Sequence, residues 1–559
     1  MQLSNRYIAR LVSLGVLLLS LVACSPKGEE TITLHILHTT DVHGNFLPFD
    51  YVKECPTTGS MARLASYVGA LRAEGEQPIL LDGGDLLQGE PITYYYNYVD
   101  TTTKHVAARF VRETACPLLS ANILRDPKNP EATYFTPYTM VERSGVRIAI
   151  LGLTTPAIPQ WLPSELYEGM YFADGLETAR HWLPIIQKKE NPDVVIALLH
   201  AGRVDKEGES NENFATALAD SVAGIDLILY GHDHQQHAEQ RVNPKGDSIF
   251  IINPANHLDR VSDVSITLHK KDGKVVSKRV EARFTELDAY DPDEEFMKQF
   301  APDATALEHF VKQPVVNLLT AIRTEDALFG FSDYLALIHD IQLTITGAKI
   351  SFAAPLSVTQ TLPRGELTMG RMFAFYPYEN YLYVMKLSGQ EIKDYLEYSY
   401  SHWVNQMKSA NDHILLLEEN ADSSSRFKTK YPTFNFSSAA GIDYTVDVSK
   451  PAGQRVKIEK MSSGEPFLLD DIYTVALNSY RGNGGGGLLT KGAGIPKDQL
   501  ADRILWSTIK EVRPYMIDIL RSRGSVLPPL AARPNWHFVP DYWAESAIVA
   551  DRQFLFGKQ

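Results

Sequence analysis

The sequence is poor in cysteine and in positive charge. Three cysteines among 559 residues, Cys24, Cys55 and Cys116, are too few for a disulfide framework. Cys55 and Cys116 could form one bridge outside the cytoplasm or remain thiols. Lys and Arg number 54 against 68 Asp and Glu, a formal net charge of -14, which argues against a nucleic-acid polymer as partner. An anionic substrate would therefore need local positive charge, from bound metal and a few arginines.

After residue 22 the sequence also lacks an apolar run long enough to cross a bilayer. The run from Leu11 to Val22 follows two arginines and is typical of a signal-peptide core. It ends in Leu21-Val22-Ala23-Cys24, which resembles a bacterial lipobox, with an ordinary secretory signal as the alternative. We therefore expect a signal peptide at 1–23, lipidation of Cys24, a tether over 24–31, and a lipoprotein anchored to a membrane of the cell envelope, facing the periplasm or the exterior.

The length and the 44% hydrophobic content predict two or more domains with large cores. Short apolar strands alternate with helical patterns in the first half, which is typical of an α/β domain. We expect this first domain over 32–291, an inter-domain helix over 292–325, a second domain over 326–525, and a tail without clear periodicity over 526–559.

Asp and His residues follow four separate strands of the first half. The strands that begin near Ile32, Pro78, Asp193 and Ile225 are followed, in that order, by Asp41 and His43, by Asp85, by His200, and by His232 and His234. Strand ends are where α/β domains place their sites. Any one of these residues could be a helix cap or a core histidine, but the set together predicts metal binding.

The motifs His38-Thr39-Thr40-Asp41-Val42-His43, Asp82-Gly83-Gly84-Asp85, Leu199-His200 and Gly231-His232-Asp233-His234 occur in the order of a known family. The chain resembles the bacterial 5′-nucleotidases and 2′,3′-cyclic-nucleotide 2′-phosphodiesterase/3′-nucleotidases. The resemblance implies a four-layer αββα metallophosphoesterase domain, followed by an α+β C-terminal domain that binds the nucleotide. It implies an exported hydrolase of nucleotide phosphoesters, and the alternative is a non-catalytic nucleotide-binding lipoprotein.

The resemblance also implies two divalent cations. One would be held by Asp41, His43, Asp85 and His234, and the other by Asp85, His200 and His232, with Asp85 bridging them and with Asp85 and His200 as catalytic residues. Such a pair would activate a bridging hydroxide for attack on phosphorus. Mixed nitrogen and oxygen ligands suit Zn, Mn, Co or Fe better than Ca.

In the second domain the same resemblance points to aromatic residues that would sandwich a nucleobase. We expect Phe436 and Tyr480 to stack on the base, with ordinary core aromatics as the alternative. Arg364 and Arg371 are weaker candidates for phosphate or ribose contacts. The family's arginine-bearing glycine motif is replaced by Pro355-Leu356-Ser357.

One family motif, Gly-Asn-His-Asp/Glu, is missing between Asp85 and Asn122. An Asn ligand of the second metal and a histidine that stabilises the transition state would be lost with it, together with about one helix and one strand. Three interpretations follow: an enzyme that is weakened or rescued by another group such as His105, a binding protein without turnover, or a sequence that lacks a block of an active enzyme.

Overall fold

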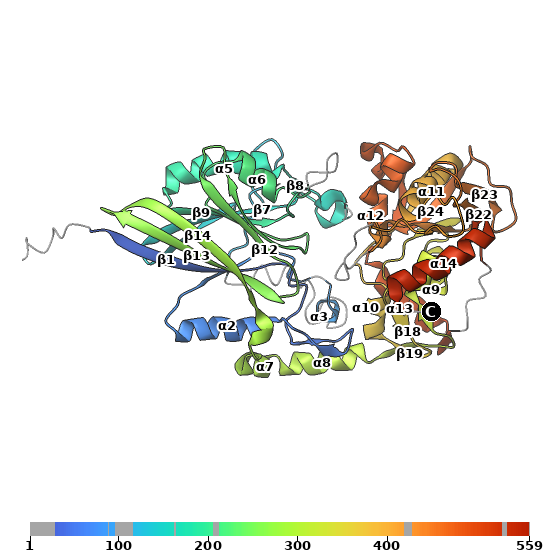
Figure 1. The fold of residues 1–559 in the computed structure, drawn as a ribbon, viewed down its shortest axis with the longest axis horizontal. Coiled ribbons are helices and arrows are strands. Elements are labelled where there is room, and N and C mark those ends of the chain that lie inside the picture. The colour runs from blue at the N-terminus through green and yellow to red at the C-terminus, as the bar shows by residue number, and fades with distance from the viewer. Residues whose placement is uncertain are drawn as a thin grey trace, which may run out of the picture.

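The computed structural model describes residues 28–87, 89–95, 116–160, 162, 164–204, 212–418, 428–527 and 534–557. Two lobes lie side by side, with α7 (Glu294–Gln299) and α8 (Ala301–Val311) running along one edge between them (Figure 1). The proposed lipidation site Cys24 lies outside the described residues, as does His105.

Two sheets form the centre of the first lobe. The four-stranded sheet has the order β14-β13-β1-β4, with β1 (Glu30–Thr39), β4 (Ile79–Asp82), β13 (Arg260–Lys271) and β14 (Lys274–Glu286). The six-stranded sheet has the order β11-β12-β10-β9-β7-β6, with β6 (Tyr138–Arg143), β7 (Val146–Thr154), β9 (Val194–His200), β10 (Leu227–Tyr230), β11 (Gln236–Val242) and β12 (Ser248–Pro254). Because β1 is parallel to β4, and β9 to β10, each pair ends at one sheet edge.

The apolar residues of these strands divide between two faces. Ile36 on β1 and Ile266 on β13 lie in a cluster between the sheets, whereas Leu37 faces α2 (Met61–Ala73). Fully burying one such side chain contributes about 1.5–3 kcal/mol. Helices α5 (Gly175–Glu190) and α6 (Ala215–Ser221) cover the far face of the six-stranded sheet, opposite α2 (Figure 1). These layers confirm the αββα arrangement.

The second lobe is an α+β domain. Its five-stranded sheet has the order β21-β17-β24-β20-β25, with β17 (Ile350–Ala353), β20 (Leu382–Ser388), β21 (Ser438–Ala440), β24 (Ile472–Asn478) and β25 (Ile504–Ser507). Its main helices are α9 (Asp333–Thr346), α10 (Met369–Phe375), α11 (Gly389–Trp403) and α13 (Val512–Ser522). Helix α11 begins with a capping box in which Ser388 and Glu391 satisfy each other's backbone N–H groups, so its start is fixed by sequence.

Two segments differ from the expected domain plan. The stretch 292–325 is not helical throughout, because α8 ends at Val311 and Pro314–Leu318 forms β15, which pairs with β19 (Gly365–Thr368). The stretch 526–559 is not a tail. It contributes β26 (Val526–Leu527), β27 (Trp536–Val539) and α14 (Asp541–Phe556), and β27 pairs with β22 (Ile442–Asp447) beside β23 (Val456–Met461). Burial of Trp536 and Phe538 in the lobe's main core holds this segment in place.

The lobes contact one another beside the segment that follows Asp85. In α3 (Pro91–Tyr94), the Tyr94 ring centroid lies 5.9 Å from that of Phe310 and 5.4 Å from that of Phe373. Gly89 donates its backbone N–H to Glu379 at 3.3 Å. The second lobe therefore packs directly against the first-lobe loop after Asp85. Within the described residues no helix is long and apolar enough to span a membrane, and Cys55 and Cys116 are not in a disulfide.

Candidate metal centre

The structure brings five of the six predicted ligands together at the ends of β1, β4, β9 and β10, and the ring of the sixth, His232, lies beside His200. Asp41, His43 and His234 have ligand atoms within 4.8 Å of one another, and so do Asp41, Asp85 and His200. The Nε2 atoms of His43 and His234 are 2.9 Å apart. Two overlapping groups that share a carboxylate are therefore present without any rearrangement of the chain.

Asp85 and His232 complete this arrangement. Asp85 is a member of the second group, and its Oδ2 atom lies 3.7 Å from His43 Nε2 of the first. The His232 ring centroid lies 5.2 Å from that of His200. The family resemblance predicts Asp85 as the shared ligand, whereas the residue that the two groups have in common in this geometry is Asp41.

The surroundings of the Asp41 carboxylate indicate whether these residues could hold a cation. Asp41 is fully buried, and its Oδ2 accepts hydrogen bonds from the Thr40 hydroxyl at 2.7 Å and the His232 backbone N–H at 2.8 Å. Its Oδ1 makes no hydrogen bond among the described residues, yet it lies 3.3 Å from His234 Nε2. A buried carboxylate oxygen that accepts no hydrogen bond from the described residues and lies near two imidazole groups matches the donor set of a transition-metal ion.

The Asp41 carboxyl is held in its ionised form. Burial alone would raise its pKa, but the contact with His234 and the charge of His200 hold the pKa well below its usual range. Carboxylates must be ionised to bind metal ions. The Asp41 carboxylate thus suits a divalent cation in its position and in its charge.

Five of the six predicted ligands have left-handed backbone conformations. Their φ angles are 50° at Asp41, 53° at His43, 54° at Asp85, 75° at His232 and 55° at His234. Such conformations cost on the order of 1–3 kcal/mol at a residue other than glycine and tend to cluster at functional sites. Two backbone hydrogen bonds fix the turns, from Asp41 N–H to Gly84 O at 2.9 Å and from His43 N–H to Asp85 O at 3.0 Å.

His200 and His232 have outer partners that orient their rings. His200 Nδ1 donates to the backbone oxygen of Gly83 at 3.0 Å, which directs Nε2 toward the centre. His232 Nε2 lies 2.8 Å from Glu212 Oε1. Sequence reasoning missed Glu212, since a single carboxylate in a polar loop carries no motif.

Asn256 and His257 also border the centre. Asn256 Nδ2 lies 3.4 Å from His234 Nδ1, and the His257 ring centroid lies 5.4 Å from that of His43. This Asn-His pair follows the last metal motif in the sequence and does not match the missing family motif. The fold nevertheless brings it to the metal centre, because β12 ends beside the carboxyl end of β10.

The prediction for Phe436 requires a correction. Its side chain is fully buried, and its ring stacks on Trp403 with centroids 5.3 Å apart and an interplanar angle of 10°. A ring enclosed in the core in this way has no open face for a base. Phe436 is a core residue of the second lobe.

Phe434, two residues earlier, lies opposite Tyr480. The two rings are half-buried, with centroids 6.3 Å apart and an interplanar angle of 79°. The buried Arg481 guanidinium donates to the Phe434 carbonyl and to Asn435 Oδ1, and lies 5.2 Å from the Tyr480 ring centroid. Arg481 therefore connects the loop that carries Phe434 to Tyr480.

The two arginines predicted to contact phosphate or ribose lie in surroundings different from those of Phe434 and Tyr480. Arg364 is exposed, and Arg371 on α10 donates to the Glu366 carbonyl at 2.9 Å. None of the contacts of the described residues joins either arginine to Phe434 or Tyr480. Their predicted roles in phosphate or ribose binding stay predictions.

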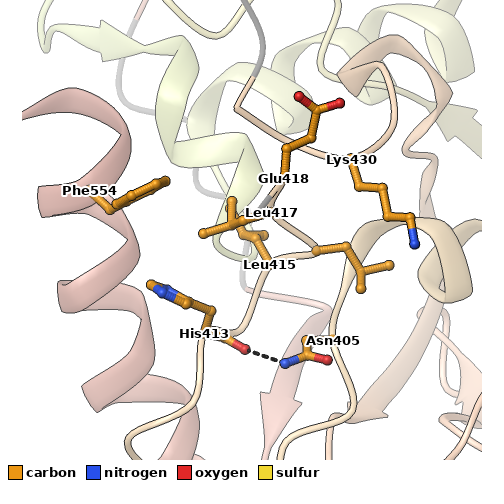
Figure 2. A pocket seen from close by; sticks show the side chains of 8 residues that line it. Asn405, His413, Leu415, Leu417, Glu418, Lys430 and Phe554 are labelled. Atoms are coloured by element: carbon orange, nitrogen blue, oxygen red, sulfur yellow. Dashed lines mark hydrogen bonds between the residues drawn. The ribbon is translucent and has the colours of Figure 1, made fainter. Parts of the chain in front are cut away.

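A hollow of about 920 Å³ lies elsewhere in the second lobe, beside α14. In Figure 2 the His413 imidazole points toward Phe554 of α14, and Leu415 and Leu417 lie between them and the Glu418 and Lys430 side chains. The fully buried Asp551 carboxylate binds His413 and the backbone N–H groups of Ile414 and Leu415, so this contact secures α14. The hollow contains none of the predicted ligands.

The chain is similar to known proteins over most of its length. Residues 321–491 match the family model described as "5'-nucleotidase, C-terminal domain". The chain is 27% identical to the 2′,3′-cyclic-nucleotide 2′-phosphodiesterase/3′-nucleotidase of Haemophilus influenzae, over 92% of this chain and 88% of the relative. It is also 27% identical to the protein of the same name from Salmonella typhimurium, over 84% of each chain.

Solved structures share the fold at lower sequence identity. A candidate 5′-nucleotidase from Staphylococcus aureus superposes with a TM-score of 0.73 at 20% identity, over 91% of this chain and 100% of that one. A 5′-nucleotidase precursor from Thermus thermophilus gives a TM-score of 0.59 at 21% identity, with the same coverage. The chain thus carries a match to the 5′-nucleotidase C-terminal domain family over residues 321–491, and along most of its length it is similar to bacterial 2′,3′-cyclic-nucleotide 2′-phosphodiesterase/3′-nucleotidases.

Proposed function

We propose that the chain is an exported, metal-dependent hydrolase of nucleotide phosphoesters, of the 5′-nucleotidase or the 2′,3′-cyclic-nucleotide phosphodiesterase/3′-nucleotidase type. The observation that carries the proposal is the convergence of four Asp and His side chains, His43, Asp85, His200 and His234, on the buried Asp41 carboxylate. Bound divalent cations would supply Lewis-acid stabilisation of the phosphoryl group and lower the pKa of a water. Export and anchoring through Cys24 are part of the same proposal and rest on the N-terminal sequence.

The roles of the protein groups follow from their positions. Asp41, His43 and His234 would hold one cation, Asp85, His200 and His232 would hold the other, and Asp85 would also border the first. Thr40 and the His232 backbone N–H fix the Asp41 carboxylate so that it binds without reorganisation. The outer contact of His200 with Gly83 keeps one ring nitrogen directed at the centre.

The direct test is product release by the soluble form that starts after Cys24, supplied with Mn²⁺ or Zn²⁺. The substrates are AMP, 3′-AMP and 2′,3′-cyclic AMP, the last with chromatography of products because ring opening frees no phosphate. Turnover of one of these esters is the expected result and identifies the preferred one. A folded, metal-loaded protein that binds nucleotide and turns over none of them would contradict the proposed activity.

Removal of metal is expected to lower turnover by at least about a hundredfold, because the cations would supply several kcal/mol of transition-state stabilisation. The measurement compares the protein before and after dialysis against a chelator, with circular dichroism to check folding. Readdition of Mn²⁺ should restore the rate. Full activity after complete metal removal, verified by elemental analysis, would exclude a metal-dependent mechanism.

Within the same proposal, Phe434 and Tyr480 contact the nucleobase. Base stacking on one aromatic ring contributes about 1–3 kcal/mol, so Phe434→Ala should raise KM for the nucleotide by about 5- to 150-fold. Because Phe434 is half-buried, the stability of the variant should change little. Steady-state kinetics and thermal unfolding measure the two effects.

Phe436→Ala is the matched comparison, two residues away. Phe436 is fully buried against Trp403, so its truncation should lower the free energy of unfolding by about 3–5 kcal/mol through a cavity in the core. A larger KM effect from Phe436→Ala than from Phe434→Ala, in folded protein, would reverse the assignment.

A further inference from the structure

Glu212 contacts a predicted metal ligand from outside the centre. Its Oε1 lies 2.8 Å from His232 Nε2, and its side chain is 29% exposed. A carboxylate oxygen of an ionised Glu can only accept, so His232 Nε2 carries the proton of this hydrogen bond. Nδ1 is then the ring atom through which His232 would bind a cation.

His200, at the end of the neighbouring strand β9, has an outer hydrogen-bond partner of the same kind as His232. There the outer partner is a backbone oxygen, Gly83 O, and the protonated nitrogen is Nδ1. The two rings lie close together, with centroids 5.2 Å apart, and each has one nitrogen engaged by an acceptor outside the centre. Outer acceptors of this kind fix the tautomer of a ligating histidine and increase its basicity. The charged carboxylate of Glu212 increases the basicity of His232 more strongly than a neutral acceptor would.

The residues after Glu212 hold it in place. Asn213 Oδ1 accepts the Gly202 N–H at 2.8 Å, Ala215 N–H donates to Gly202 O at 3.1 Å, and the intervening Phe214 is buried. A Cβ at Gly202 would lie 2.3 Å from Asn213 Oδ1, so only glycine permits this approach. The contact with His232 is therefore built on a fixed segment at the start of α6.

We propose that Glu212 is a positioning residue of the metal centre, which accepts the proton of His232 Nε2 and presents Nδ1 of that ring to a divalent cation. The proposal rests on the metal centre of the proposed function. It assigns a role to a residue outside the six predicted ligands. It also accounts for a half-buried carboxylate that lies 2.8 Å from the Nε2 atom of a predicted ligand.

The test measures Mn²⁺ binding to the metal-free full chain. Calorimetry gives the affinity, and electron paramagnetic resonance gives the concentration of free Mn²⁺. Glu212→Ala should weaken the binding of one of two ions by about 10- to 100-fold, with two ions still bound at saturation. Glu212→Gln should show a smaller loss, because its amide oxygen accepts the same hydrogen bond without charge. Glu239→Gln is the matched control: Glu239 contacts His237 at 3.2 Å and is 31% exposed, and its change should leave binding unaltered.

Two results would overturn the role of Glu212. Unchanged affinity in both Glu212 variants would show that it does not act on the centre, and loss of one ion at saturation in Glu212→Gln would make it a direct ligand instead. His232→Ala separates this failure from failure of the metal centre. If His232→Ala weakens binding and the Glu212 variants do not, only the positioning role fails; if wild type binds no Mn²⁺, the proposed function fails.

Discussion

Asp85→Ala is expected to reduce nucleotide hydrolysis by at least about a thousandfold, the largest loss we expect from any single side chain. Asp85 has ligand atoms within 4.8 Å of those of Asp41 and His200, and its Oδ2 lies 3.7 Å from His43 Nε2. Its removal would take a carboxylate from both cation positions at once. Preorganised charge at one position alone is typically worth a hundred- to a thousandfold in rate.

The backbone around Asp85 should survive this change. The bonds that join the two turns use backbone atoms, from Asp41 N–H to Gly84 O and from His43 N–H to Asp85 O, and alanine retains them. The variant should therefore fold and bind fewer Mn²⁺ ions, as measured by elemental analysis beside the rate of phosphate release. Asp220→Ala is the control, since Asp220 forms an exposed ion pair with Arg241 that contributes about 0–1 kcal/mol. Turnover by Asp85→Ala close to that of wild type would remove Asp85 from the mechanism.

The strands that precede the predicted ligands could be recognised in the sequence because two signals agree at each of them. An apolar run such as Leu227–Tyr230 predicts a buried parallel strand, and the Gly231-His232 step that follows ends it at a sheet edge. Burial of β7, β9 and β10 follows the same pattern. Since strand ends converge in space, the sequence could predict that these Asp and His residues lie near one another, and five of the six do.

The errors occur where a local pattern allows two structures. Val315 and Leu318 continue the helical spacing of Phe310 and Val311, but Pro314 cannot donate within a helix and the chain forms β15 there. The Pro-rich sequence before Trp536 gave no periodicity from which β27 could be predicted. This strand pairs with β22, which is far from it in sequence. Short strands of this kind depend on partners that periodicity does not reveal.

The choice between Phe434 and Phe436 could not be made from sequence. Both are aromatic and lie on either side of Asn435, and only the packing of Trp403 against Phe436 shows which ring is enclosed. Glu212 and His257 were missed for a related reason. Glu212 lies in a loop without a motif, and His257 follows the end of β12 but matches no family motif, so neither contact, with His232 or with His43, could be read from the sequence.

Gly231→Ala is expected to damage the centre almost as severely as loss of Asp85, although Gly231 binds nothing itself. A Cβ at this position would lie 2.0 Å from Thr40 Oγ1 and 2.4 Å from Asp41 Oδ2, far inside van der Waals contact. Both atoms belong to the arrangement that fixes the Asp41 carboxylate, because Thr40 and the His232 N–H donate to Oδ2. The β1 and β10 ends would have to separate, and Asp41 would move with them.

A displacement of about 1 Å in a reacting group can cost a hundredfold in rate, so Gly231→Ala should lower turnover by at least about that factor and weaken Mn²⁺ binding in parallel. Gly69→Ala is the control: Gly69 lies in α2, and a Cβ there meets no atom within 4 Å. That change should leave turnover unaltered and increase helix stability by about 0.5–1 kcal/mol. Circular dichroism must show Gly231→Ala folded for the comparison to hold. A folded Gly231→Ala protein with unchanged turnover and Mn²⁺ affinity would show that the position of the Asp41 carboxylate does not limit the reaction, and the proposed centre would lose its principal support.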